Sequence, residues 1–240
     1  DYDPLVGLDS FEDGYFDWNW DAMELINAGD VGDALSYTMA DWFSFFNQGA
    51  NKAGTAVSDC HNDTCPGDAR SFIRTGEDDP SLVSADMFVD AIKHQRVQAS
   101  SGPFITAGVG EAGIGDTADL GGDGAVKLHV KVQAPTWMPV DWVRVVVNGD
   151  IMAVYEADQL QEGVVRFDQD VDLTVDKDSW IVVFAGAPTK DLSPVSVGQR
   201  VLSIANPVFV DLDGDGYQAP GLPDAEHAAE AFAALAALAP

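Results

Sequence analysis

The sequence predicts an α/β segment followed by an all-β segment and a short helical tail. Three observations lead to this fold class: a strand–helix–strand pattern early in the chain, a later Gly- and Asp-rich stretch, and β-rich apolar runs after it, several of them alternating. We expect an α/β part over residues 1–105, a linker over 106–125, a β-sandwich over 126–210, and a calcium-loop-like turn with a tail helix over 211–240.

The α/β part rests on the order of its elements. Residues 21–27 (DAMELIN) are strand-like, residues 33–49 form a helical pattern, and GTAVSD (54–59) is typical of a short buried strand. Gly49 is a suitable stop for the helix. The apolar residues with helical spacing are Leu35, Met39, Trp42, Phe43 and Phe46. Strand, helix and strand in this order indicate a βαβ unit with parallel strands.

A second helix and a series of strands follow. Residues 84–96 have helical spacing, with Ser84 as the expected N-cap. Beyond the linker, runs such as VKLHVKV, WVRVVVNGD and WIVVFAGA are strand-like, and Asn-Gly-Asp at 148–150 is a strong hairpin signal. The density of strands predicts a β-sandwich of immunoglobulin-like type, although the Cys…Trp…Cys pattern of true immunoglobulin domains is missing. The Ala-rich sequence at 224–240 predicts a short tail helix.

The charge of the chain excludes some partners. With 40 Asp and Glu against 12 Lys and Arg, the net charge is -28. Nucleic acid and anionic membrane surfaces would repel such a chain, and cations, including Ca²⁺, would be attracted to it. No apolar run reaches the roughly 20 residues of a membrane span. The acidity and the two closely spaced cysteines predict an extracellular or periplasmic, cell-envelope location.

The sequence DLDGDG near the carboxyl-terminal end resembles a calcium loop. Asp211, Asp213 and Asp215 occupy positions 1, 3 and 5 of such a loop, and the carbonyl of Tyr217 would occupy position 7. The bidentate acid of position 12 is missing, because that residue is Leu222. Two interpretations stay open: a structural Ca²⁺ site and a plain acidic turn.

Residues 54–65 contain a second group of potential ligands. A zinc site on Cys60, His61 and Cys65 would lack a fourth ligand. A disulfide between the two cysteines would close a short loop. In a third hypothesis, compatible with the disulfide, Asp59 and His61 bind Zn²⁺, Mn²⁺ or Fe at the end of the preceding strand. Ligands bind at such strand ends in parallel α/β sheets.

Several segments together resemble one enzyme family. The S-D-x-H of Ser58, Asp59 and His61 resembles the final metal motif of PHP domains, the polymerase and histidinol phosphatase metallohydrolases. WDAMELINAGD, DARSFIRT and AIKHQRVQASSGPFI resemble segments of the carbaryl-hydrolase-like branch of that family. The resemblance covers about residues 1–150.

The resemblance implies the carboxyl-terminal part of a distorted (β/α)7 barrel, with a two- or three-metal centre that hydrolyses phosphoesters or related small esters. Asp59 and His61 would be metal ligands, and Arg70 would line the substrate site. The family's earlier His and Glu ligands have no counterpart, so we expect an upstream half, cleaved or on a separate chain, to complete the enzyme. The alternative is a calcium-stabilised β-sandwich that serves as a binding or adhesion module, attached to a degenerate, non-catalytic barrel remnant.

Overall fold

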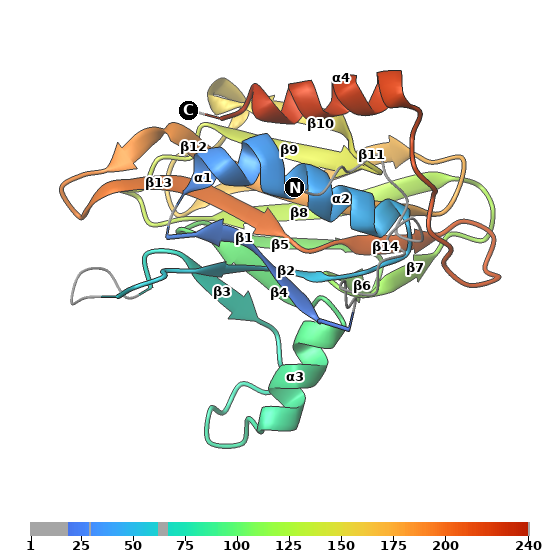
Figure 1. The fold of residues 1–240 in the computed structure, drawn as a ribbon, viewed down its shortest axis with the longest axis horizontal. Coiled ribbons are helices and arrows are strands. Elements are labelled where there is room, and N and C mark those ends of the chain that lie inside the picture. Colours follow the sequence, from blue (N-terminus) through green and yellow to red (C-terminus); the bar gives the residue numbers. More distant parts are fainter. Residues whose placement is uncertain (1–18, 29, 62–66, 240) are drawn as a thin grey trace, which may run out of the picture.

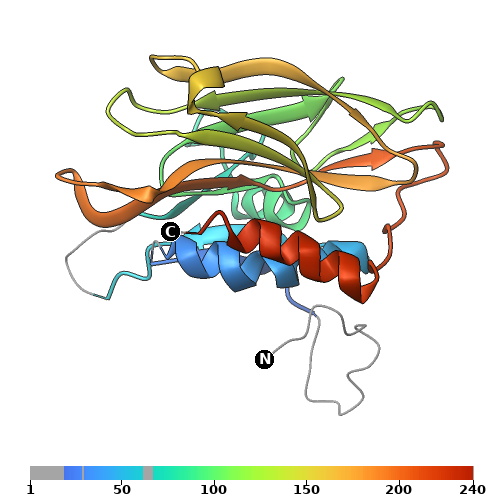
Figure 2. The same cartoon turned by 90° about the horizontal axis from the view of Figure 1, so that it is seen from above.

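The computed structural model describes residues 19–28, 30–61 and 67–239 and is mostly β (Figure 1). Seen from above, a small sheet, a large sheet and a layer of helices lie on top of one another (Figure 2). The helical segments are α1 (Val31–Asp33), η2 (Ala34–Thr38), α2 (Met39–Asn47), α3 (Ala85–Lys93), η3 (Ala157–Gln159) and α4 (Ala225–Ala236).

Three sheets contain the described strands. The large sheet consists of β3 (Arg70–Ile73), β4 (Val97–Ser100), β7 (Thr117–Asp119), β9 (Trp142–Val147), β10 (Asp150–Glu156), β12 (Ser179–Leu192), β13 (Ser196–Ala205) and β14 (Val208–Asp211). The small sheet consists of β5 (Phe104–Val109), β6 (Ala112–Gly113), β8 (Ala125–Gln133) and β11 (Val165–Thr174). The third sheet pairs only β1 (Ala22–Asn27) with β2 (Ala53–Val57).

The predicted strand–helix–strand unit is confirmed locally. β1 and β2 are parallel, and the helical segment α1–η2–α2 connects them. The five side chains of the predicted helical stripe are all buried. They pack toward the large sheet, where the rings of Phe43 and Trp180 lie 4.6 Å apart and Trp180 Nε1 donates to Asn47 Oδ1 at 2.8 Å. The apolar face of the helix is therefore buried against a sheet, as its period predicts.

The predicted fold class is wrong beyond this unit, because no (β/α)7 barrel is present in the described residues. β3 and β4, expected in the barrel, pair antiparallel with each other, and β4 pairs with β13 from the expected sandwich. β6, β7 and most of β5 lie in the expected linker. The immunoglobulin-like expectation fails for the same reason: backbone hydrogen bonds join β3 and β4 from the expected barrel to strands of the expected sandwich in one large sheet.

The large sheet is covered on both faces, and the burial of its central strand, β12, shows this. β12 is buried over its first ten residues, because one face packs on the small sheet and the other on the helices. A continuous apolar run such as WIVVFAGA is typical of a strand covered on both faces. In contrast, β8 alternates between exposed and buried residues, since the outer face of the small sheet meets solvent.

Smaller sequence predictions are also confirmed. Ser84 caps α3, with its Oγ 3.2 Å from the backbone N of Met87. Asn148 and Gly149 have positive φ angles of 53° and 109° and connect β9 to β10 in a hairpin. The Ala-rich tail forms α4, capped by Asp224 and packed through Leu235 beside the α1–η2–α2 segment (Figure 2).

Candidate functional site

Asp59 and His61 lie together just after the carboxyl end of β2. His61 Nε2 is 2.9 Å from Asp59 Oδ1, and both side chains are exposed. The Asp59 backbone has a φ of 44°, and Ala28, just after the neighbouring end of β1, has a φ of 50°. Non-glycine residues are uncommon in this left-handed region, although Asp adopts it more readily than Ala, and such conformations are found at functional sites as well as in turns. Two residues with this conformation thus mark the same edge of the parallel pair.

A histidine–aspartate contact is by itself common in this acidic chain. His94 lies 3.1 Å from Asp90, and His227 lies 2.8 Å from Asp150. His129 contacts carboxylates across the small sheet. What distinguishes the Asp59–His61 pair is therefore its place at the end of a parallel strand and the left-handed backbone of Asp59, not the contact.

The chemistry of the pair fits one edge of a metal site. Ligand atoms bound to one tetrahedral Zn²⁺ at about 2.0–2.2 Å lie roughly 3.3–3.6 Å apart. The two atoms here are 2.9 Å apart, which is a hydrogen-bond distance, so they would separate slightly to hold the ion. A carboxylate oxygen and an imidazole nitrogen suit Zn²⁺, Mn²⁺ or Fe. Within the described residues no third Asp, Glu, His or Cys joins them in a metal-sized cluster.

The other residues predicted for this site are placed differently. Arg70 begins β3, is exposed, and has its guanidinium carbon 5.9 Å from the ring centre of Phe72. No hydrogen bond among the described residues joins it to Asp59 or His61. Cys60 is half-buried between the two candidate ligands. Cys65 lies outside the described residues, so the predicted disulfide stays a prediction.

A second cluster of carboxylates forms around the predicted calcium loop. Ligand atoms of Asp178, Asp211 and Asp213 all lie within 4.8 Å of one another. Asp215, which the spacing predicts as a ligand, is not a member of this carboxylate cluster. The predicted role of the Tyr217 carbonyl stays a prediction. Asp178 comes from the turn between β11 and β12, and the DLDGDG spacing carries no signal for it.

Hydrogen bonds hold the cluster in shape. The two carboxylate oxygens of Asp211 accept from the backbone N of Gly214 at 2.8 Å and of Gly216 at 2.9 Å. Those of Asp178 accept from Leu212 N at 2.8 Å and Gln218 N at 2.7 Å. The donor set is entirely oxygen, which suits Ca²⁺, an ion that takes six to eight oxygen ligands. Backbone carbonyls and water would have to complete such a shell.

Tyr217 has a structural position beneath this loop. Its ring packs against Phe209 with centroids 4.9 Å apart. Its hydroxyl is buried and has no hydrogen-bond partner among the described residues. Burial, together with the negative charge of Asp178, raises the pKa of Tyr217 well above its usual value of 10. The side chain is therefore an apolar anchor for the loop.

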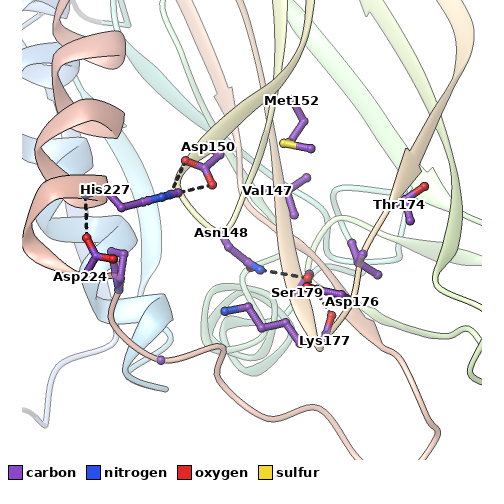
Figure 3. A pocket seen from close by; sticks show the side chains of 13 residues that line it. Val147, Asn148, Asp150, Met152, Thr174, Asp176, Lys177, Ser179, Asp224 and His227 are labelled. Atoms are coloured by element: carbon purple, nitrogen blue, oxygen red, sulfur yellow. Dashed lines mark hydrogen bonds and ion pairs between the residues drawn. The ribbon is translucent and has the colours of Figure 1, made fainter.

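A separate polar cavity of about 320 Å³ lies between the β9–β10 hairpin, the β11–β12 turn and α4 (Figure 3). His227 of α4 points across it to Asp150, with both carboxylate oxygens within 3.0 Å of Nε2. The buried hydroxyl of Ser179 accepts from Asn148 Nδ2 and donates to the Lys177 carbonyl. The His227–Asp150 pair connects α4 to β10 and so attaches the helix to the large sheet.

Comparison with known proteins found no family model, no curated protein and no solved structure that matches the chain. None of the described helices combines the length and apolar composition that a membrane crossing requires.

Proposed function

We propose that the chain contributes part of the metal centre of a secreted hydrolase that acts on phosphoesters or related small esters. The observation that carries the proposal is the position of Asp59 and His61, 2.9 Å apart at the carboxyl end of a parallel strand. The resemblance of Ser58, Asp59 and His61 to the metal motif of PHP-type hydrolases supports it. The barrel of that family forms no part of the proposal.

Asp59 and His61 would hold a divalent ion such as Zn²⁺, Mn²⁺ or Fe²⁺. The chemistry that such an ion supplies when bound is activation of a water molecule for attack on an ester. The role of this chain is to hold two ligands close together on one loop. Arg70, on the neighbouring β3, is proposed to bind the anionic part of the substrate.

Two protein ligands are too few for a catalytic metal, which normally has at least three. We propose that an upstream half of the enzyme, cleaved or on a separate chain, supplies the others. The edge arrangement of β1 supports this part of the proposal: β1 pairs with β2 on one side, and no described strand pairs with its other side. An unpaired parallel edge is a suitable place for a further strand to add.

Metal titration tests the proposal with a closely matched control. The His61→Gln variant should weaken Zn²⁺ or Mn²⁺ binding, measured by calorimetry, by more than the about tenfold that even an outer-shell partner contributes. His94→Gln is the control, because His94 and Asp90 form another exposed histidine–aspartate pair, at the end of α3. In the protein together with any upstream chain, Asp59→Asn should abolish hydrolysis of bis(p-nitrophenyl) phosphate. Equal metal loss in both histidine variants would contradict the proposal.

The carboxylate cluster favours a second candidate function. We propose that Asp178, Asp211 and Asp213 bind a structural Ca²⁺, and that the chain serves as a calcium-stabilised binding or adhesion module if the hydrolase proposal fails. The supporting observation is that three carboxylates from two separate loops lie within 4.8 Å. Carboxylates this close repel each other unless a cation neutralises them. A structural ion would connect the β11–β12 turn to the segment that leads to α4.

A further inference from the structure

An apolar cavity of about 430 Å³ lies where the chain turns from the large sheet into the small one. β3 and β4 form one wall, and β5 with the segment around β6 forms the other. Phe72 and Phe104 meet edge to face across this turn, with ring centroids 5.2 Å apart. Phe104 is 44% exposed, a large fraction for an aromatic side chain. The cavity has the size of a small-molecule site and a largely apolar lining.

The charge of the lining differs sharply from that of the chain. Arg74 and Arg96 line the cavity, whereas none of the Asp and Glu residues that the structure describes is among its lining residues. The chain has only 12 Lys and Arg in total. Two guanidinium groups beside an apolar wall, in so acidic a protein, are complementary to a ligand that combines an apolar body with an anionic group.

Asp116, which lies behind the lining, holds both guanidinium groups in place. It accepts from Arg74 Nη2 at 2.7 Å, from Arg96 Nε at 3.2 Å and from the Gly113 backbone N at 3.2 Å. Arg74 Nη2 also donates to the Ile114 carbonyl, and Arg96 Nη1 forms an ion pair with Asp90 at 3.5 Å. The arginines are thus oriented by fixed partners rather than free to move with the solvent.

Donors remain available after these contacts. Among the described residues, Nε and Nη1 of Arg74 and Nη2 of Arg96 have no hydrogen-bond partner. Both bidentate donor pairs of Arg74 include Nη2, which already donates to Asp116 and Ile114, so a carboxylate would accept single hydrogen bonds from the free donors of the two arginines. One bound carboxylate could therefore be held without displacing Asp116.

We propose that this cavity binds a small amphipathic carboxylate, with its aromatic or aliphatic body against Phe72 and Phe104 and its carboxylate on Arg74 and Arg96. The site is separate from the proposed metal centre, since none of its lining residues is a proposed ligand. It does not depend on the proposed hydrolase function. Pre-oriented arginines explain how an acidic protein can bind an acidic ligand.

Binding of 2-naphthoate, measured by calorimetry and by NMR shifts of β3 and β5 amides, tests the proposal. 2-Naphthylmethanol is the matched neutral probe. Arg74→Gln should weaken naphthoate binding by at least about tenfold, because charge-assisted hydrogen bonds are lost, and should leave binding of the alcohol nearly unchanged. Phe104→Ala should weaken both probes. Lys127→Gln is the charge-matched control, since Lys127 is exposed on the outer face of β8.

A second variant, Gly113→Ala, leaves the net charge unchanged and should displace the guanidinium group of Arg74. A Cβ at position 113 would lie 2.9 Å from Arg74 Nη1, so Gly113→Ala should displace the guanidinium and weaken naphthoate binding with no change of net charge. Circular dichroism verifies that each variant is folded. The proposal is overturned if naphthoate does not bind the unmodified protein at millimolar concentration, or if Arg74→Gln and Lys127→Gln bind it equally well.

Discussion

The side chain of Asn206 pairs with the backbone of Gly54 as a neighbouring strand would. Asn206 Oδ1 accepts from Gly54 N at 2.7 Å, and its Nδ2 donates to the Gly54 carbonyl at 2.8 Å. Asn206 is only 1% exposed. The contact attaches the β1–β2 pair to the large sheet at the junction of β13 and β14. Because Asp59 and His61 follow β2, the position of the candidate metal pair depends on it.

Asn206→Asp should therefore be strongly destabilising. The variant loses the donor to the Gly54 carbonyl and buries a carboxylate, so we expect a decrease of about 3 kcal/mol or more in the free energy of unfolding. Urea denaturation measures this free energy. Asn206→Ala, which leaves both Gly54 groups unpaired without adding a charge, should cost less than Asn206→Asp. Equal stability of Asn206→Asp and the unmodified protein would show that the contact is not formed.

Calcium should stabilise the protein through the carboxylate cluster. At 100 times its Kd a bound ion adds about 2.7 kcal/mol, which corresponds to a rise of about 5–10 °C in Tm for a domain of this size. Mg²⁺ at the same concentration controls for general screening of the negative charge. Asp213→Asn and Asp178→Asn should remove the difference between Ca²⁺ and EDTA.

The comparison of Asp213→Asn with Asp215→Asn is the sharper experiment. The loop spacing makes both residues ligands, whereas the structure includes only Asp213 in the cluster. Asp215→Asn should keep the calcium response. If both variants lose the calcium response, the spacing is a better guide to the ligands than the observed arrangement.

Local features of this fold follow from the sequence, and the assembly of the strands does not. Three local features depend only on neighbours within a few residues, so residue spacing predicts them. They are the apolar stripe that includes Trp42 and Phe46, the helix cap at Ser84 and the turn at Asn148. The pairing of β4 with β13, such as Ala99 with Ile204, joins residues far apart in the chain. No periodicity specifies such a partner, so a correct strand–helix–strand unit was extended to a barrel that the chain does not form.

The same limit applies to the candidate sites. Asp59 and His61 are two residues apart, and their contact was predictable because a short loop keeps them together. Asp178 joins Asp211 only because β12 and β14 pair antiparallel, with Ser179 opposite Val210. Asp178 lies in an acidic turn before an apolar strand, and this pattern is too common to identify Asp178 as a ligand from the sequence. Ligands that converge through sheet pairing thus escape a search based on spacing.

Tyr217→Phe should preserve or increase stability. The hydroxyl of Tyr217 is buried without a hydrogen-bond partner among the described residues, so its removal relieves a desolvation cost of about 1 kcal/mol or more. Absorbance at 295 nm provides a second measurement: since burial raises the pKa of Tyr217, one tyrosine should ionise well above pH 10 and only with unfolding. A loss of stability in Tyr217→Phe would instead reveal a partner for the hydroxyl.

Asp116 should make stability depend on pH in the acid range. Burial alone would raise the pKa of Asp116, but hydrogen bonds from Arg74, Gly113 and Arg96 outweigh it and hold the pKa below the usual 3.8. A lowered folded-state pKa stabilises the protein fully above the unfolded value and loses this effect as the pH falls through the folded one. The stability advantage over Asp116→Asn should therefore be constant above pH 5 and shrink below about pH 4. Asp172→Asn, which removes an exposed carboxylate on β11, is the control for the change of net charge.

Two anchors hold α4, and their relative strength can be estimated. The His227–Asp150 pair is about half exposed, and surface pairs of this kind contribute about 1 kcal/mol or less. Leu235 is 1% exposed, and truncation of a buried leucine costs about 2–5 kcal/mol. Leu235→Ala should therefore increase amide exchange throughout Ala225–Ala236, whereas His227→Gln should change it only slightly. Mass spectrometry of exchanged peptides distinguishes the two, and the opposite ranking would mean that the ion pair, not apolar burial, holds the helix.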